Sequence, residues 1–135
     1  MVEDIVRAAR EAAAILANIQ SEGRNSSGEW LVRQLKTAVC TKLMIPETEE
    51  TNIRRLVIMS IKRQDLKSQN LPDAVIEKQI RRYDCHQTSL AAQRKVLLIL
   101  FVEKGLGIHF TDEEAVEIET IEDLAERAGK QLREG

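Results

Sequence analysis

The residue types best suited to nucleophilic chemistry meet at one place in the sequence, Asp84-Cys85-His86. A thiol and an imidazole form a nucleophile and its base when the two side chains face each other. Adjacent residues of a helix or a strand point in different directions, so this spacing does not bring the sulfur and the ring together. We therefore expect no independent active site, and we interpret the chain as a protein that is not an enzyme.

The remaining candidate metal ligands have no typical spacing either. Cys40 and Cys85 lack the CxxC partners of a structural zinc site, which predicts two free thiols. His109 has no neighbour at metal-ligand spacing. The carboxylates between Asp112 and Glu122 stand where helices begin, and acids there complement the helix dipole. We expect these carboxylates to cap helices and no metal ion to be bound.

Composition indicates one folded domain with an aliphatic core. The chain has 135 residues, of which 43% are hydrophobic, 31% charged and only 3% aromatic. Its longest apolar run, Val96 to Val102, is much shorter than the roughly 18 residues of a membrane span. The N-terminal residues place acids and arginines among the apolar positions, unlike a secretory signal. We expect a cytoplasmic protein without a membrane partner.

Charge is unevenly distributed along the chain. Ten bases stand against four acids from Arg54 to Lys95, and ten acids against four bases from Glu103 to Glu134. A basic helical face can bind phosphate non-specifically. A nucleic-acid partner is nevertheless disfavoured, because the sequence pI is about 5.8 and residues that stack on bases are nearly absent. The two charged halves are expected to attract each other or to attract separate protein partners.

Apolar residues recur at steps of three and four along the chain, which predicts helices rather than strands. The N-terminal helix is expected over residues 1–20, and the Ser- and Gly-rich residues 21–28 form a loop. Further helical stripes are predicted from Glu29 to Pro46, after a cap at Thr51 or Asn52, and from Pro72 to Tyr83. The fold class is therefore all-α, a helical bundle of five or six helices in a single domain over 1–135, with the N-terminal helix at 1–20 and the bundle at 29–128.

The C-terminal helices are predicted from their ends. The run from Val96 to Val102 belongs to a longer apolar stretch, so its length favours a nearly buried helix, with Gly105 and Gly107 as its stop. Thr111 precedes Glu114 by three residues, and Thr120 precedes Asp123 by three. Both pairs have the spacing of a capping box, which predicts two successive helix starts.

These features together resemble the second half of acyl carrier proteins. The segment "LAAQRKVLLILFVEKGLGIHFTDEEAVEIETIEDLAERA", about residues 90–128, has the family's long helix, its Leu-Gly-Ile turn, its acidic Asp-Glu-Glu-Ala segment and the start of its last helix. The matching residues are Leu106 to Ile108, Asp112 to Ala115, Ile118, Thr120, Ile121 and Asp123. The resemblance implies that Val96, Leu98, Ile99, Val102 and Leu106 are buried.

The same alignment removes the family's attachment chemistry. Acyl carrier proteins bear phosphopantetheine on a serine that opens their long helix, and this position is Ala92 here. A methyl group cannot form the phosphodiester. A second register, one helical turn away, offers Ser89 as the attachment residue but sets Gln93 and Lys95 on core positions. Phosphopantetheine is therefore a cofactor only if Ser89 carries it.

The charges at this helix also depart from the family. Acyl carrier proteins present an acidic second helix to partner enzymes, whereas Arg94 and Lys95 stand here. The resemblance implies an atypical carrier-derived protein that acts by protein–protein interaction in acyl or peptidyl metabolism, with acyl-processing enzymes among its partners. The open alternative is a helical interaction or adaptor module, unrelated to acyl transfer, that binds other proteins or associates with itself as a homo-oligomer.

Overall fold

The computed structural model describes residues 2–68 and 88–134, and this part of the chain is helical with no named strand. The expected all-α bundle of five or six helices is confirmed. The helix expected from Pro72 to Tyr83 and the triplet Asp84-Cys85-His86 lie outside the described residues. The elements are α1 (Val2–Glu22), the 3-10 turn η1 (Gly23–Asn25), α2 (Gly28–Leu43), α3 (Ile53–Ser68), α5 (Thr88–Leu106), α6 (Asp112–Glu117) and α7 (Ile121–Glu134).

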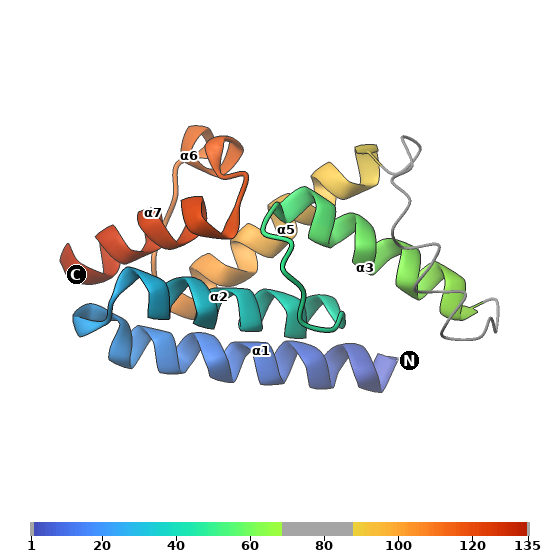
Figure 1. Ribbon diagram of the computed structural model, residues 1–135, viewed down its shortest axis with the longest axis horizontal. Coiled ribbons are helices and arrows are strands. Elements are labelled where there is room, and N and C mark those ends of the chain that lie inside the picture. Colours follow the sequence, from blue (N-terminus) through green and yellow to red (C-terminus); the bar gives the residue numbers. More distant parts are fainter. Residues whose placement is uncertain (1, 69–87, 135) are drawn as a thin grey trace.

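The helices form two groups that meet at α5. In Figure 1, α1 and α2 run antiparallel as a hairpin, and α7 lies along α2 at the end of the molecule where α6 stands. At the other end α3 packs on α5, and α5 crosses to contact α1. None of the described helices combines the length and the apolar character that a bilayer-crossing helix needs.

The core is aliphatic, as the composition predicts. One cluster of buried side chains joins the long helices. Among the described residues, Phe110 is the aromatic member of this buried cluster. The largest fully buried side chains are Leu16, Ile19, Leu35, Val39, Ile53, Leu56, Ile99, Leu106, Ile118, Ile121 and Leu124. Apolar burial of this kind is the main stabilising contribution to a small bundle.

The helix ends follow the predicted capping chemistry. The Asn52 side chain accepts the Arg55 N–H at 3.1 Å and begins α3. At α6, Thr111 and Glu114 exchange two hydrogen bonds of 3.1 Å in a complete capping box. The Thr120 and Asp123 side chains do the same for α7, at 3.1 and 3.2 Å. Both predicted C-terminal helix starts are therefore confirmed.

The starts of α3 and α7 are also tied to each other. Asn52 and Thr120 form an isolated antiparallel bridge. Across it, the Ile53 N–H donates to the Glu119 carbonyl at 2.8 Å, and the Ile121 N–H donates to the Thr51 carbonyl at 2.9 Å. Each helix thus satisfies one of its otherwise unpaired first-turn N–H groups with the chain that leads into the other helix.

The two glycines near the end of α5 have different roles. Gly107 has φ of +69° and follows the last helical residue, so it provides the predicted stop. The prediction that Gly105 also ends the helix is wrong, because Gly105 lies within α5. A Cβ at Gly105 would come within 2.4 Å of the Leu16 Cδ1 atom. Gly105 therefore allows α1 and α5 to approach closely.

Leu98→Ala tests the contribution of α5 to the core. Leu98 is 4% exposed within the buried cluster, so we expect its truncation to lower the free energy of unfolding by about 2 to 5 kcal/mol. Urea unfolding followed by circular dichroism measures the change. The matched control is Leu97→Ala, because Leu97 is 63% exposed and its truncation should change stability little. Equal effects of the two substitutions would contradict this assignment of the helix faces.

Candidate functional site

Helix α5 is apolar on its outer face as well as on its inner face. Leu98, Ile99, Val102 and Leu106 point into the core, as the alignment implies. The expectation that Val96 is buried is wrong, because 52% of the surface of this residue is accessible to solvent. The exposed apolar residues of α5, which we call the α5 outer face, are Leu90, Val96, Leu97 and Leu100.

The geometry of a helix explains this correction. Each residue turns the helix by about 100°, so Leu97 and Leu100 project away from Leu98 and Val102. A continuous apolar run therefore supplies side chains to every side of the helix, whereas α1 and α3 cover only part of it. Helices that are apolar all round are normally buried completely. The uncovered side of α5 is thus the main unexplained apolar surface among the described residues.

A groove of about 150 Å³ continues the α5 outer face toward the starts and ends of other helices. Ile5, itself 46% exposed, reaches it from α1. The residues that line it are Ile5, Lys42, Leu43, Met44, Ser60, Gln64, Arg94, Leu97 and Leu98. The Ser60 hydroxyl donates to the Leu43 carbonyl at 2.6 Å, so its polar atom is already satisfied by the fold.

Two cations border the groove. The Lys42 Nζ atom lies 5.1 Å from the centre of the Phe101 ring, within the range of a cation–π interaction. Arg94 is exposed on α5. The charged side chains that line the groove are thus both positive, and its remaining lining is apolar or neutral.

The two candidate attachment positions differ in their place on α5. Ser89 lies in the first turn of the helix, which begins at Thr88. Ala92 lies one turn further along and is half-buried. The alignment that uses Ser89 as the attachment residue places Gln93 and Lys95 at core positions. The structure leaves Gln93 exposed and Lys95 half-buried.

Lys95 faces the junction of α3 and α7 and not the groove. Burial lowers the pKa of its ammonium group, and the nearby Arg54 lowers that pKa further. Glu119 and Asp123 act in the opposite direction and favour the charged form. Lys95 is therefore part of the electrostatic environment of the paired helix starts.

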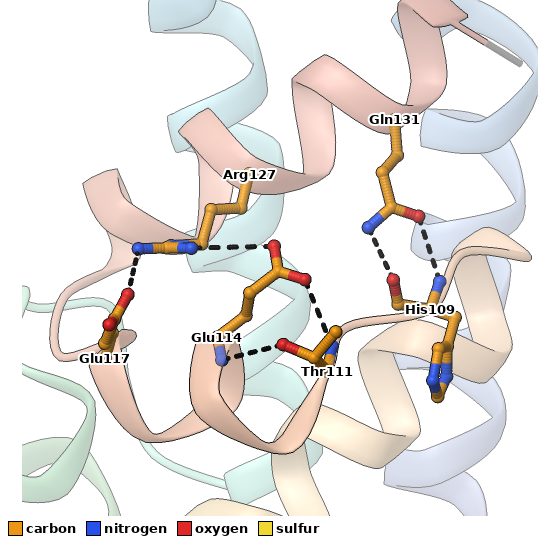
Figure 2. A network of polar contacts seen from close by, with 6 residues as sticks. All are labelled: His109, Thr111, Glu114, Glu117, Arg127 and Gln131. Atoms are coloured by element: carbon orange, nitrogen blue, oxygen red, sulfur yellow. Dashed lines mark hydrogen bonds and ion pairs between the residues drawn. The ribbon is translucent and has the colours of Figure 1, made fainter.

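Three carboxylates of the C-terminal part, those of Glu114, Glu117 and Asp123, have hydrogen-bond or ion-pair partners within the fold. Helix α6 has no buried residue, and it is fastened to α7 by the polar contacts in Figure 2. The Arg127 guanidinium lies 2.8 Å from the Glu117 carboxylate and 3.5 Å from the Glu114 carboxylate. The Gln131 amide donates to the His109 carbonyl at 2.6 Å and accepts the His109 N–H at 3.0 Å.

These contacts account for the perturbed carboxylates without catalysis. The backbone N–H of Thr111 lowers the pKa of Glu114, with smaller contributions from the Thr111 hydroxyl and Arg127. The backbone N–H of Glu119 lowers the pKa of Asp123, aided by Thr120 and Arg127. Both shifts favour the ionised carboxylates that cap helices and neither prepares a general acid.

The nucleophile and metal candidates among the described residues are Cys40 and His109. Burial raises the pKa of the Cys40 thiol to about 11, so the reactive thiolate is disfavoured near neutral pH. The imidazole ring of His109 is largely exposed, and its Nδ1 atom lies 3.5 Å from the carboxylate of the buried residue Glu103. Within residues 2–68 and 88–134, no three His, Cys, Asp or Glu residues are grouped to hold a metal ion.

A second, larger hollow lies between α2 and α7. Its volume is about 770 Å³, and its apolar floor includes Leu31, Val32 and Ala125. Acids and bases alternate around it, from Glu29 and Arg33 on α2 to Glu122, Glu126 and Arg133 on α7. This mixture gives no preferred ligand charge, unlike the groove beside α5.

Comparisons with models of protein families, with characterised proteins and with solved structures find no match for this chain. The resemblance to acyl carrier proteins therefore rests on the sequence of residues 90–128 alone. The α5 outer face was missed from the sequence. Helical phase separates Leu97 and Leu100 from Leu98 and Val102, but in a continuous apolar run it does not say which side is covered.

We expect the protein to remain unmodified when incubated with coenzyme A and a broad-specificity phosphopantetheinyl transferase. The reason is that Ala92 stands at the aligned attachment position and has no hydroxyl group. Intact-mass measurement of the wild type, Ser89→Ala and Ala92→Ser checks this. Modification gained by Ala92→Ser would show that the fold supports transferase docking. A mass increase of the wild type that disappears in Ser89→Ala would make Ser89 the attachment residue.

Asp123 should make stability depend on pH. Its pKa is lowered from the ordinary value of 3.8 in the folded chain, so the ionised carboxylate stabilises the fold above that value. This contribution is lost as the pH falls through the lower folded pKa. We therefore expect Asp123→Asn to be less stable than the wild type at about pH 7, with the difference shrinking toward about pH 2.5.

Urea unfolding at several pH values measures this difference. Glu122→Gln is the control, because Glu122 is an exposed acid of the same helical turn. A difference between the wild type and Asp123→Asn that stays constant with pH would contradict the proposed capping role.

Proposed function

We propose that this protein is a non-enzymatic helical interaction module that binds another protein through the α5 outer face. The observation that supports this most directly is the pair of apolar faces on one helix. The inner face of α5 belongs to the core, whereas Leu90, Val96, Leu97 and Leu100 are exposed on the outer face. Clustered exposed apolar side chains are typical of protein interaction sites.

The α5 outer face lies on a helix that is anchored in the core. Its residues project from a helix whose other side is anchored by Leu98, Ile99 and Val102. A rigid helix presents a preformed surface, so little conformational entropy is lost when a partner docks. The adjoining groove enlarges the surface with residues from α1 and α2.

The resemblance to acyl carrier proteins gives this proposal a setting. That family presents its second helix to partner enzymes, and α5 is the helix that corresponds to it by sequence. In this interpretation the protein is carrier-derived and acts in the cytoplasm, in acyl or peptidyl metabolism, by contact with partner proteins. An interaction module unrelated to acyl transfer would use the same surface, so the first experiment tests the surface.

Site-specific photo-crosslinking in cells of the source organism tests the proposed surface. With p-benzoylphenylalanine at Leu100, we expect irradiation to yield one discrete adduct, because an apolar partner surface lies against that position. Mass spectrometry then identifies the partner. Leu97→Asp in the same chain should abolish the adduct, since a buried unpaired carboxylate is costly in an interface.

The matched control places the photoreactive residue at Ala14, which is exposed on α1. Circular dichroism should show an unchanged fold for Leu97→Asp, because Leu97 contributes little to the core. The proposal fails if Leu100 yields no adduct, or if Leu100 and Ala14 yield the same adducts.

A further inference from the structure

The α5 outer face is basic as well as apolar. The other exposed residues of α5 are Gln93 and Arg94, which lie between Leu90 and Val96, and Lys104, which lies one turn beyond Leu100. Glu103 is the acidic residue of α5, and it is buried, with 8% of its surface exposed. Neither Arg94 nor Lys104 forms an ion pair with a described residue. The surface therefore presents cations to a partner without any acid of α5 between them.

The adjoining groove has the same charge. Its two charged lining residues are Lys42 and Arg94, which come from different helices. The contact of Lys42 with the Phe101 ring keeps this cation beside the apolar stripe. Two independent elements thus place positive charge along one border of the exposed apolar surface.

We infer that this surface binds an amphipathic helix of another protein, and that this partner helix carries acidic residues beside its own apolar stripe. The inference rests on the proposed function. The α5 outer face from Leu90 to Leu100 extends over ten residue steps of the helix, or roughly 15 Å at 1.5 Å per residue. This length accommodates about three turns of a partner helix packed along α5. Apolar side chains give such a helix its affinity, and acids opposite Lys42, Arg94 and Lys104 give it selectivity.

A second copy of the chain fits this surface less well. Pairing two α5 outer faces brings Arg94 and Lys104 of both copies into one interface, with no exposed acid of α5 to offset them. The acidic α6 of a second copy offers a single strongly exposed apolar residue, Val116. That residue is too small to cover four exposed apolar side chains of α5. Charge and apolar area together favour a different protein.

Two synthetic 18-residue peptides test the inference on the full chain. Both carry leucine at positions i, i+3, i+4 and i+7 of a repeating helical stripe, and the remaining positions are mainly glutamate in one peptide and lysine in the other. Fluorescence anisotropy measures their binding. We expect the glutamate peptide to bind at least about tenfold more tightly than the lysine peptide, and the difference to shrink in high salt.

Variants of the protein assign the binding to this surface. Leu97→Ala should weaken binding of the glutamate peptide by about tenfold, since it removes a central apolar contact. Val116→Ala, which truncates an exposed apolar residue on α6, should leave it unchanged. The double substitution Arg94→Glu and Lys104→Glu should reverse the preference in favour of the lysine peptide.

The outcomes separate this inference from the proposed function. Equal binding of both peptides that is lost in Leu97→Ala would overturn the acidic partner but keep the interaction surface. Sedimentation equilibrium that shows a dimer dependent on Leu97 would replace the partner by a second copy. If the protein is a monomer that binds neither peptide, the inference is wrong. If, in addition, the photoreactive residue at Leu100 yields no crosslink, the proposed function is wrong as well.

Discussion

The bridge between Asn52 and Thr120 is the constraint on which the arrangement of this molecule depends. It joins the start of α3, which packs on α5, to the start of α7, which packs on α2. The two hydrogen bonds across it, 2.8 and 2.9 Å long, use N–H groups that an isolated helix would leave to water. The bridge thereby couples the two groups of helices directly, in addition to the contact of α1 with α5.

The second fixed point is the close approach of α1 and α5 at Gly105. Since a Cβ there would overlap the Leu16 side chain, only glycine keeps the helices at this distance. The bridge fixes the start of α3, which packs on α5, and the glycine contact sets the distance between α5 and α1. The side of α5 that faces α1 and α3 lies in the core, while the α5 outer face stays exposed.

Local chemistry made part of this structure predictable. The caps at Asn52, Thr111 and Thr120 follow from residues three positions apart, and a bond over that distance does not depend on the rest of the fold. The exposure of Val96 and the role of Gly105 depend on which helices cover α5, which is a long-range property. The apolar run of α5 gave no periodic contrast by which the covered side could be assigned. The candidate surface was therefore hidden in a segment whose helical state was predicted correctly.

The uneven charge of the sequence acquires a physical meaning in this fold. Glu114, Glu117 and Asp123 cap helices or pair with Arg127, so the charge of these three acids is used within the molecule. On α5, by contrast, Arg94 and Lys104 remain exposed beside apolar side chains. A cation exposed beside apolar side chains gains Coulomb energy from an acid that approaches it while water is excluded, which is the physical basis of the inferred preference. Arg94, one of the two cations by which this segment departs from the acidic helix of acyl carrier proteins, is thus also one of the cations of the proposed surface.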